Sequence, residues 1–348
     1  MVGMLRCLLL VLALGAVFPL PASPAQAPNA PAPVQQPGGP LPPIPVPRYE
    51  TVAPSGNTPF LPAAPQNPND FLAGPPSPQC SLAAQCGYYG LFEISLLFPE
   101  IRGMLSGPVT VTGLPTNNVS LGSASLDATG SPRLEIGYRF GDSMGAVAVA
   151  YRSIVSKGGD NAPSISPFGN PFLSSLINVN VVDIDYVSPA YNILPYWNVS
   201  WRAGIRTAGA YYNSQLISTF GHQEATSNFL GAGPHAELEL GRALEIVPGL
   251  AVLAKIDGAI LVGNIAQSFS ETLQTTPPIG GASVFNSTET VPVMTFDLGL
   301  SYTPPGCLNW ARFGLGYQFE YWWDVGNSGN SHGNLLINGI YFRGEFNF

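Results

Sequence analysis

The chain has 348 residues and a formal net charge of −8, and only 10% of its residues are charged, well below the share of about 25% in soluble domains. An acidic chain with few basic residues lacks the positive patch that phosphate binding requires, which excludes a nucleic-acid partner. Glycine (39) and proline (36) are both abundant. After the N-terminal leader no run of about 18 apolar residues occurs, so the sequence predicts no transmembrane helix in the rest of the chain.

Residues 1–25 have the three parts of a secretory signal peptide. Arg6 supplies the positive start, residues 7–18 form the apolar core, and Ser23 and Ala25 are the small residues before the expected cleavage site. Because the apolar core is too short for a membrane anchor, we predict cleavage after Ala25.

Residues 26–79 form a linker rich in proline, alanine, glutamine and asparagine. Proline lacks the backbone N–H and fixes φ, so the stretch favours neither a helix nor a paired strand. It also has too little apolar surface to form a core, which predicts a disordered segment. The alternative is an extended spacer that reaches across the periplasm toward the cell wall.

From residue 87 onward the chain repeats segments in which apolar and polar residues alternate. A period of two predicts a strand with one apolar and one polar face. In the last segment Phe342, Phe346 and Phe348 alternate with Arg343 and Glu345. The ten segments span residues 88–98, 131–140, 145–153, 179–187, 197–212, 229–240, 250–262, 291–302, 310–323 and 339–348.

The position of the charges separates a membrane barrel from a soluble sandwich. Every charged residue within the ten segments lies on the less apolar face, whereas a charge facing lipid near mid-membrane costs about 2–4 kcal/mol. The connections also alternate in length, as in barrels with long outer loops and short periplasmic turns. The long ones cover residues 101–128, 156–177, 213–227 and 264–290, with 326–334 of medium length.

These features predict an all-β fold, a transmembrane antiparallel up-and-down β-barrel of about 10 strands (range about 8–12) over residues 80–348. An even number of strands places the N-terminal segment and the C-terminus on the periplasmic side of a bacterial outer membrane. The last strand, with Phe346 and Phe348 at its end, resembles the signal that the barrel assembly machinery recognises. Outer-membrane lipid and that machinery are therefore the expected partners, and cell wall is a further one through the linker.

Six stretches carry a family resemblance: "SPRLEIGYRF", "VVDIDYV", "WRAGIRTA", "FLGAGPHAELEL", "LGLSYTP" and "LGYQFEYWWDVG". In this order and spacing, they resemble the Legionella-type major outer membrane protein family over roughly residues 87–348. The resemblance implies an outer-membrane barrel that forms a pore. It provides no catalytic residues, and the proline-rich segment is not part of the family pattern.

The polar face predicts a lumen lined by eight basic and ten acidic residues. Ten strands lie closer to the eight-stranded barrels that side chains fill than to the open channels of about 16–18 strands, so we expect a narrow or occluded lumen. Arg202 is expected to pair with Asp183 or Asp185 across the hairpin at residues 188–195. The lumen-lining residues are Glu93, Arg133, Glu135, Arg139, Arg152, Asp183, Asp185, Arg202, Arg206, Glu237, Glu239, Lys255, Asp257, Asp297, Arg312, Glu320, Arg343 and Glu345.

Two function classes follow from this lumen. A narrow small-solute pore is the first, because of the resemblance. The alternative is a non-conducting structural barrel that anchors the envelope or displays its loops.

Other chemistry is weakly supported by the sequence. His222 and Asp160 fall in outer loops, where a loop-borne enzyme could place an acid–base pair, but no further catalytic pattern accompanies them, so we expect no enzyme. The histidines lack metal-ligand spacing, and no cofactor is expected. Cys80 and Cys86 are the preferred disulfide pair of an exported chain, with Cys307 left over.

Overall fold

The computed structural model describes residues 86–111, 115–141, 144–161, 171–219, 221–275, 278–305, 310–327 and 331–348. The predicted signal peptide and proline-rich segment lie outside these residues and stay predictions. The described part contains no helix that is long and apolar enough to cross a membrane.

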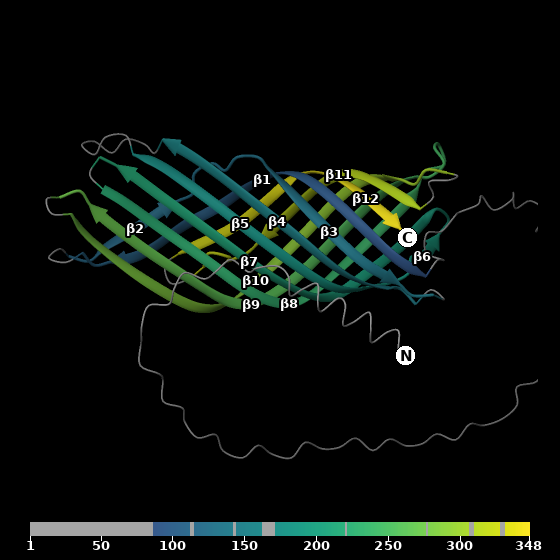
Figure 1. Cartoon of the computed structure of the whole chain (residues 1–348), viewed down its shortest axis with the longest axis horizontal. Coiled ribbons are helices and arrows are strands. Elements are labelled where there is room, and N and C mark those ends of the chain that lie inside the picture. Colours follow the sequence, from purple (N-terminus) through teal and green to yellow (C-terminus); the bar gives the residue numbers. More distant parts are fainter. Residues whose placement is uncertain are drawn as a thin grey trace, which may run out of the picture. The chain divides into compact units, whose positions relative to one another are not determined.

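Twelve strands make up the described structure (Figure 1). They are β1 (Gly87–Val109), β2 (Asn117–Gly122), β3 (Thr129–Arg139), β4 (Ala146–Asn161), β5 (Phe172–Val187), β6 (Tyr191–Leu194), β7 (Trp197–Ser218), β8 (Gly221–Ala243), β9 (Leu250–Leu273), β10 (Ile279–Tyr302), β11 (Ala311–Trp322) and β12 (His332–Asn347).

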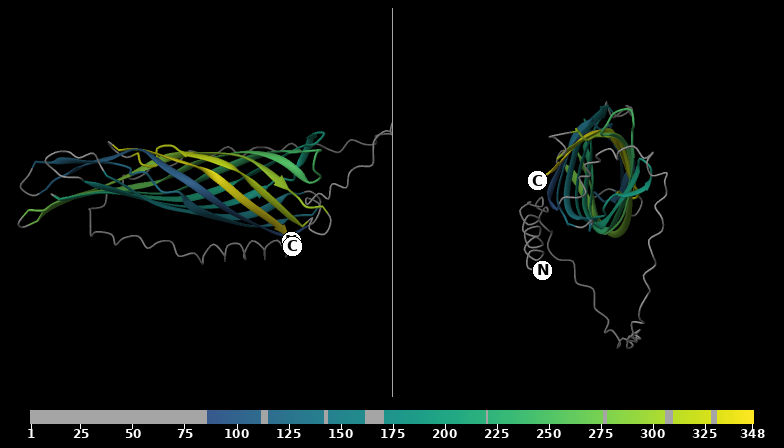
Figure 2. Two further views of the ribbon diagram at one scale, coloured as in Figure 1. Left: turned by 90° about the horizontal axis from the view of Figure 1, so that it is seen from above. Right: turned by 90° about the vertical axis from the view of Figure 1, so that its right-hand side faces the viewer.

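Ten of these strands close into a ring, which confirms the predicted fold class. Every pairing is antiparallel, in the order β12-β11-β10-β9-β8-β7-β5-β4-β3-β1, and β1 pairs again with β12. The end-on view in Figure 2 shows the closed wall. Each of the ten strands therefore has a paired neighbour on either side, although residues 153–161 of β4 and 279–292 of β10 are paired on one side only. A sheet without water on its outer side requires such closure.

Alternation decides which side of the wall each residue faces. On β1, Phe92, Ile94 and Leu96 are exposed on the outer face, whereas Glu93 and Ser95 are buried inside. The same pattern holds along the other ring strands, where large apolar side chains such as Leu315 stay about half exposed on the outside. The outer face is therefore an apolar belt of the kind that lipid covers.

The two ends of the barrel differ. At one end, here called the terminal end, Gly87 and Phe348 lie together, and the Phe348 amide donates to the Tyr88 carbonyl at 2.9 Å. The short turns after β3, β5, β8 and β10 lie at this end as well. The opposite end, here called the far end, carries β2 (Figure 1).

The predicted long loops at the far end are mostly strand, and this corrects the sequence analysis. β7 and β8 pair up to Ser218 and Gly221, and β9 and β10 pair up to Leu273 and Ile279. Residues 213–227 and most of 264–290 are therefore paired backbone. Their hydrophobic alternation fades because this part of the wall extends past the apolar belt, while the backbone hydrogen bonds continue.

The β1–β2 hairpin closes the far end from inside. β1 pairs with β12 as far as Met104 and then pairs with β2. Cα atoms of β2 lie within 8 Å of those of β7, β8 and β9, which are not its neighbours in the sheet. Gly103, at φ 140°, makes this bend, and a Cβ there would lie 2.0 Å from the His332 carbonyl oxygen. Only glycine fits such a position.

Below the hairpin, an apolar layer fills the middle of the lumen. It includes Leu97, Phe229, Leu261 and Trp322, none of which has exposed surface. Fully burying side chains of this size contributes about 1.5–3 kcal/mol each. A second apolar cluster, with Phe269 against Gly107, joins the hairpin to the inner faces of β7, β8 and β9.

Candidate functional site

The third layer of the lumen, nearest the terminal end, is a network of charged side chains. All eighteen residues expected to line the lumen lie on the inner face, with side-chain exposures between 1% and 29%. Their strands carry the apolar belt at the same level, as Glu93 and its outward neighbours Phe92 and Ile94 show. Charges buried at this depth are stable only when paired and hydrogen-bonded.

Some pairs bridge strands that are not neighbours. Arg152 on β4 reaches across to Glu320 on β11 and binds both carboxylate oxygens, each at 2.6 Å. This forked geometry is the strongest arrangement for a guanidinium with a carboxylate. Arg312 on β11 lies 3.7 Å from Glu239 on β8. These contacts brace the barrel from one wall to the other.

Arg202 makes three ion pairs, and its main partner differs from the predicted one. Its guanidinium lies 2.8 Å from Glu135 on β3, 3.4 Å from Glu237 on β8 and 3.7 Å from Asp185 on β5. Asp183 instead binds Arg206, which is its register partner across β5 and β7.

The prediction was wrong about Asp183 because it counted the register outward from the middle of the hairpin at residues 188–195. The chain stays extended through β6 and turns at residues 195–196, with Tyr196 at φ 68°. This shifts the register, so that Arg202 faces Val187.

A histidine lies at the centre of the network. His235 Nδ1 lies 3.0 Å from Asp185, and its Nε2 lies 2.9 Å from Asp257 and 3.0 Å from Arg206. Arg206 also binds Asp183 at 2.7 Å and Asp257 at 2.9 Å. The cluster thus joins strands β5, β7, β8 and β9.

The geometry of this cluster also allows a test for a metal site. Donor atoms of Asp183, Asp185 and His235 lie within 4.8 Å of one another, as do those of His235, Glu237 and Asp257. However, the Arg206 guanidinium already lies against His235 and two of the carboxylates. It supplies the positive charge that a metal ion would bring and would repel one, so these residues do not form a good metal site.

Pairs between neighbouring strands complete the network. Arg343 binds Glu93 at 2.6 Å, and Lys255 binds Asp297 at 2.6 Å. Arg139 on β3 also pairs with Glu345 on β12 near the terminal mouth, across the intervening strand β1.

A polar cavity lies inside the charged layer. The volume that the centre of a water-sized sphere can occupy in it is about 20 Å³. Its wall includes Arg133, Lys255, Asp257, Asp297 and Gln318. The cavity is therefore polar and large enough for a buried solvent molecule.

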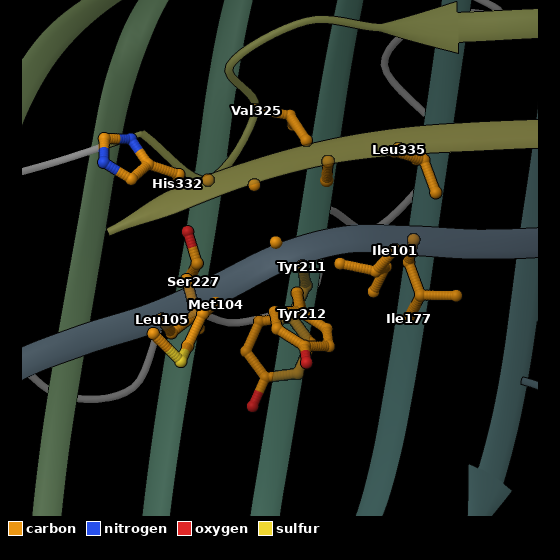
Figure 3. Close-up of a pocket in the computed structure, with 14 residues that line it drawn as sticks. Ile101, Met104, Leu105, Ile177, Tyr211, Tyr212, Ser227, Val325, His332 and Leu335 are labelled. Atoms are coloured by element: carbon orange, nitrogen blue, oxygen red, sulfur yellow. The ribbon is translucent and has the colours of Figure 1, made fainter. Parts of the chain in front are cut away.

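A second, apolar pocket lies under the bend of β1, and Figure 3 shows its lining side chains. Ile101 and Met104 of the bend face Tyr211 and Tyr212 of β7 there, with Leu335 of β12 beside them (Figure 3). The volume that water-sized spheres can occupy in this pocket is about 30 Å³. The engineered cavity that binds benzene has a far larger volume, about 150 Å³. In this conformation the pocket is too small for an apolar ligand of that size.

The residues proposed for a loop-borne enzyme are not brought together. Asp160 is on β4 and accepts a hydrogen bond from the Ser125 amide at 2.6 Å, while His222 is on β8. Strands β5 and β7 separate the two in the ring. Each of them lies on strand rather than in a loop.

The remaining sequence candidates lie at the terminal end. Cys86 is exposed and free of a disulfide, and its predicted partner Cys80 is outside the described residues, as is Cys307. Phe346 contacts the rings of Trp310 and Phe313, and Phe348 is exposed.

The structure places three further residues in the lumen whose contacts the sequence did not predict. His235 had inward parity on its strand, but nothing in its spacing marked Asp185 and Asp257 as its partners. Trp322 is not among the residues predicted to line the lumen, yet its indole is fully buried and donates to Glu320 at 2.6 Å. Gln318 is uncharged and so is not among the predicted lumen-lining residues, yet it lines the polar cavity.

A closed antiparallel ring with an outward apolar belt and an inward charge network defines a transmembrane β-barrel. Residues 177–348 match the family model described as Legionella pneumophila major outer membrane protein precursor. This confirms the resemblance over that part of the chain and makes the protein an outer-membrane β-barrel protein with buried charge pairs. The resemblance described from the sequence also covered residues 87–176, which lie outside this match.

Three solved structures with some likeness to this chain are distant from it in sequence. The outer membrane protease OmpT from Escherichia coli is 9% identical, with a TM-score of 0.46, over 75% of this chain and 97% of that chain. The toluene transporter TodX from Pseudomonas putida is 10% identical, with a TM-score of 0.27, over 76% and 90%. Ail, the attachment invasion locus protein of Yersinia pestis, is 11% identical, with a TM-score of 0.21, over 74% and 99%. At these scores the likenesses carry no argument about function, and no curated protein matches the sequence.

Proposed function

We propose that this protein is a non-conducting structural barrel of the bacterial outer membrane, which anchors its N-terminal segment and holds its far-end strands outside the lipid. The observation that carries the proposal is the filling of the lumen. A charged layer, an apolar layer and the β1–β2 hairpin follow one another along the barrel axis.

The narrowness of the far end supports this reading. Strands β1 and β2 approach β7, β8 and β9 across the ring to within 8 Å between Cα atoms, and packed sheets lie about 10 Å apart with their side chains interdigitated. At that separation side chains occupy the space that a channel would need.

The orientation in the membrane is part of the proposal. Short turns and both barrel termini lie at the terminal end, which suits the periplasmic side. The segment before residue 86 would then start in the periplasm, where it could reach the cell wall. Lipid and the barrel assembly machinery are the expected partners, and no enzymatic activity is proposed.

A narrow small-solute pore is the second candidate. The family resemblance favours it, and so does the polar cavity within the charged layer. For solutes to pass, both the apolar layer around Trp322 and the β1–β2 hairpin would have to move aside.

Liposome swelling separates the two candidates. Purified full-length protein is reconstituted into liposomes, which are then diluted into isotonic arabinose, with a general porin as the positive control. The structural proposal predicts swelling no faster than in protein-free liposomes. Swelling that increases with the amount of protein would support the pore.

A further inference from the structure

The polar cavity of the charged layer contains buried polar atoms without a partner. Asp297 on β10 and Gln318 on β11 are direct partners across the strand pair. Both are at least nine-tenths buried, and both line the cavity. Nevertheless, Asp297 Oδ1 and Gln318 Nε2 form no hydrogen bond with the described residues.

A third group at the cavity is also poorly matched. Arg133 carries five N–H donors, and its ion pair with Glu135 is long, at 3.5 Å. Its register partner on β4 is Arg152, a like charge whose guanidinium is occupied by Glu320. The Arg133 guanidinium therefore lines the cavity with donors to spare.

The pattern specifies what can occupy the cavity. Leaving a buried donor or acceptor unpaired costs about 1–3 kcal/mol each. An occupant that satisfies Gln318 Nε2 must accept a hydrogen bond, and one that satisfies Asp297 Oδ1 must donate one. Water does both, and it needs only about 10–15 Å³ of such space, against about 20 Å³ here.

We propose that the cavity is a built hydration site, in which about one or two bound water molecules bridge Gln318 and Asp297 and hydrogen-bond to Arg133. The water completes the network between β10 and β11, where side chains alone do not. A metal cation fits less well, because Arg133, Lys255 and the Gln318 amide present positive or donor groups to the same space. An anion is opposed by Asp257 and Asp297.

The direct test is a high-resolution crystal structure of the full chain, with crystals grown in sodium chloride and in rubidium chloride. We expect a density peak within about 2.7–3.2 Å of both Gln318 Nε2 and Asp297 Oδ1, without anomalous signal in rubidium. The absence of a peak would overturn the proposal. An anomalous rubidium peak at this position would replace the hydration site with a cation site.

A substitution tests the same site through stability. Gln318→Met removes the amide and nearly keeps its volume. If water bridges the amide, the variant loses hydrogen bonds, and its thermal unfolding midpoint in detergent falls. If the cavity is dry, the variant removes an unpaired buried donor, and the midpoint rises.

Gln267→Met is the matched control, because it removes an equally buried amide whose Nε2 already donates to the Gly326 carbonyl at 2.9 Å. The proposal expects both variants to shift the midpoint downward. An unchanged or higher midpoint for Gln318→Met, beside a lower one for Gln267→Met, contradicts it. Should Gln318→Met fail to fold, the crystallographic test of the unaltered chain still decides.

Discussion

Single buried charges determine whether the charged layer is stable. Arg202 illustrates this, because three carboxylates converge on its guanidinium from β3, β5 and β8, with Glu135 the nearest at 2.8 Å. Removing one member of a buried ion pair leaves the other charge uncompensated, which typically costs about 3–5 kcal/mol, whereas replacing the whole pair by apolar groups is often close to neutral.

We predict that Arg202→Met lowers the free energy of unfolding by about 3–5 kcal/mol in urea titrations of the barrel in lipid vesicles. Adding Glu135→Gln should recover part of this loss, because one of the orphaned carboxylates is then neutral. The control is Arg102→Met, since Arg102 pairs with Glu100 on the exposed surface, where solvent screens the pair, and it should leave the free energy of unfolding nearly unchanged.

Additive losses in the Arg202→Met/Glu135→Gln double variant would show that the two side chains do not interact. In that case the cross-lumen pairing described above would be wrong.

At the scale of the strands, the β1–β2 hairpin departs most from a simple up-and-down barrel. The β2 residues Val119 and Leu121 are buried against Phe269 and Tyr212 of the opposite wall. The Tyr212 and Ser214 hydroxyls both donate to the Gly122 carbonyl, at 3.2 and 2.7 Å. The hairpin is therefore held by apolar packing as well as by hydrogen bonds.

Phe269→Ala should loosen the hairpin without opening the charged layer. The ring lies directly under Gly107, and truncating a buried Phe costs about 3–5 kcal/mol. We expect faster amide hydrogen exchange over residues 117–122, with unchanged exchange over residues 253–257. Phe172→Ala, at an exposed ring, is the control and should alter neither region. Equal protection of residues 117–122 in all three proteins would mean that the hairpin is not packed as described.

The sequence predicts which side of the barrel wall each strand residue faces. It predicts the length of the strands and the pairing of their side chains less well. Parity alone places Glu93 and Arg343 inside, because a one-residue shift would bring a charge to the lipid. It cannot show that Leu97 and Leu261, of the same parity, form an apolar layer above the charges. It also cannot find Arg152–Glu320, because contacts across a lumen depend on how the ring closes and on its stagger. The turn at Tyr196 was misplaced for a local reason, since β6 continues the extended chain.

For the whole molecule, ring closure is the main source of resistance to unfolding. Each strand of the ring is paired on both sides, so no strand separates without breaking two ladders. We predict heat-modifiable migration, in which unboiled protein in detergent runs at a different apparent mass from boiled protein. Identical migration of the two samples, together with recovery in a soluble fraction, would count against a closed membrane barrel.

Single-channel recording in planar lipid bilayers tests the central claim of a filled lumen most directly. The filled lumen predicts that purified full-length protein, inserted in 1 M KCl and held at voltages of either sign, shows no discrete current steps, whereas a general porin prepared in the same way conducts. Reproducible current steps whose frequency rises with the amount of inserted protein would contradict it.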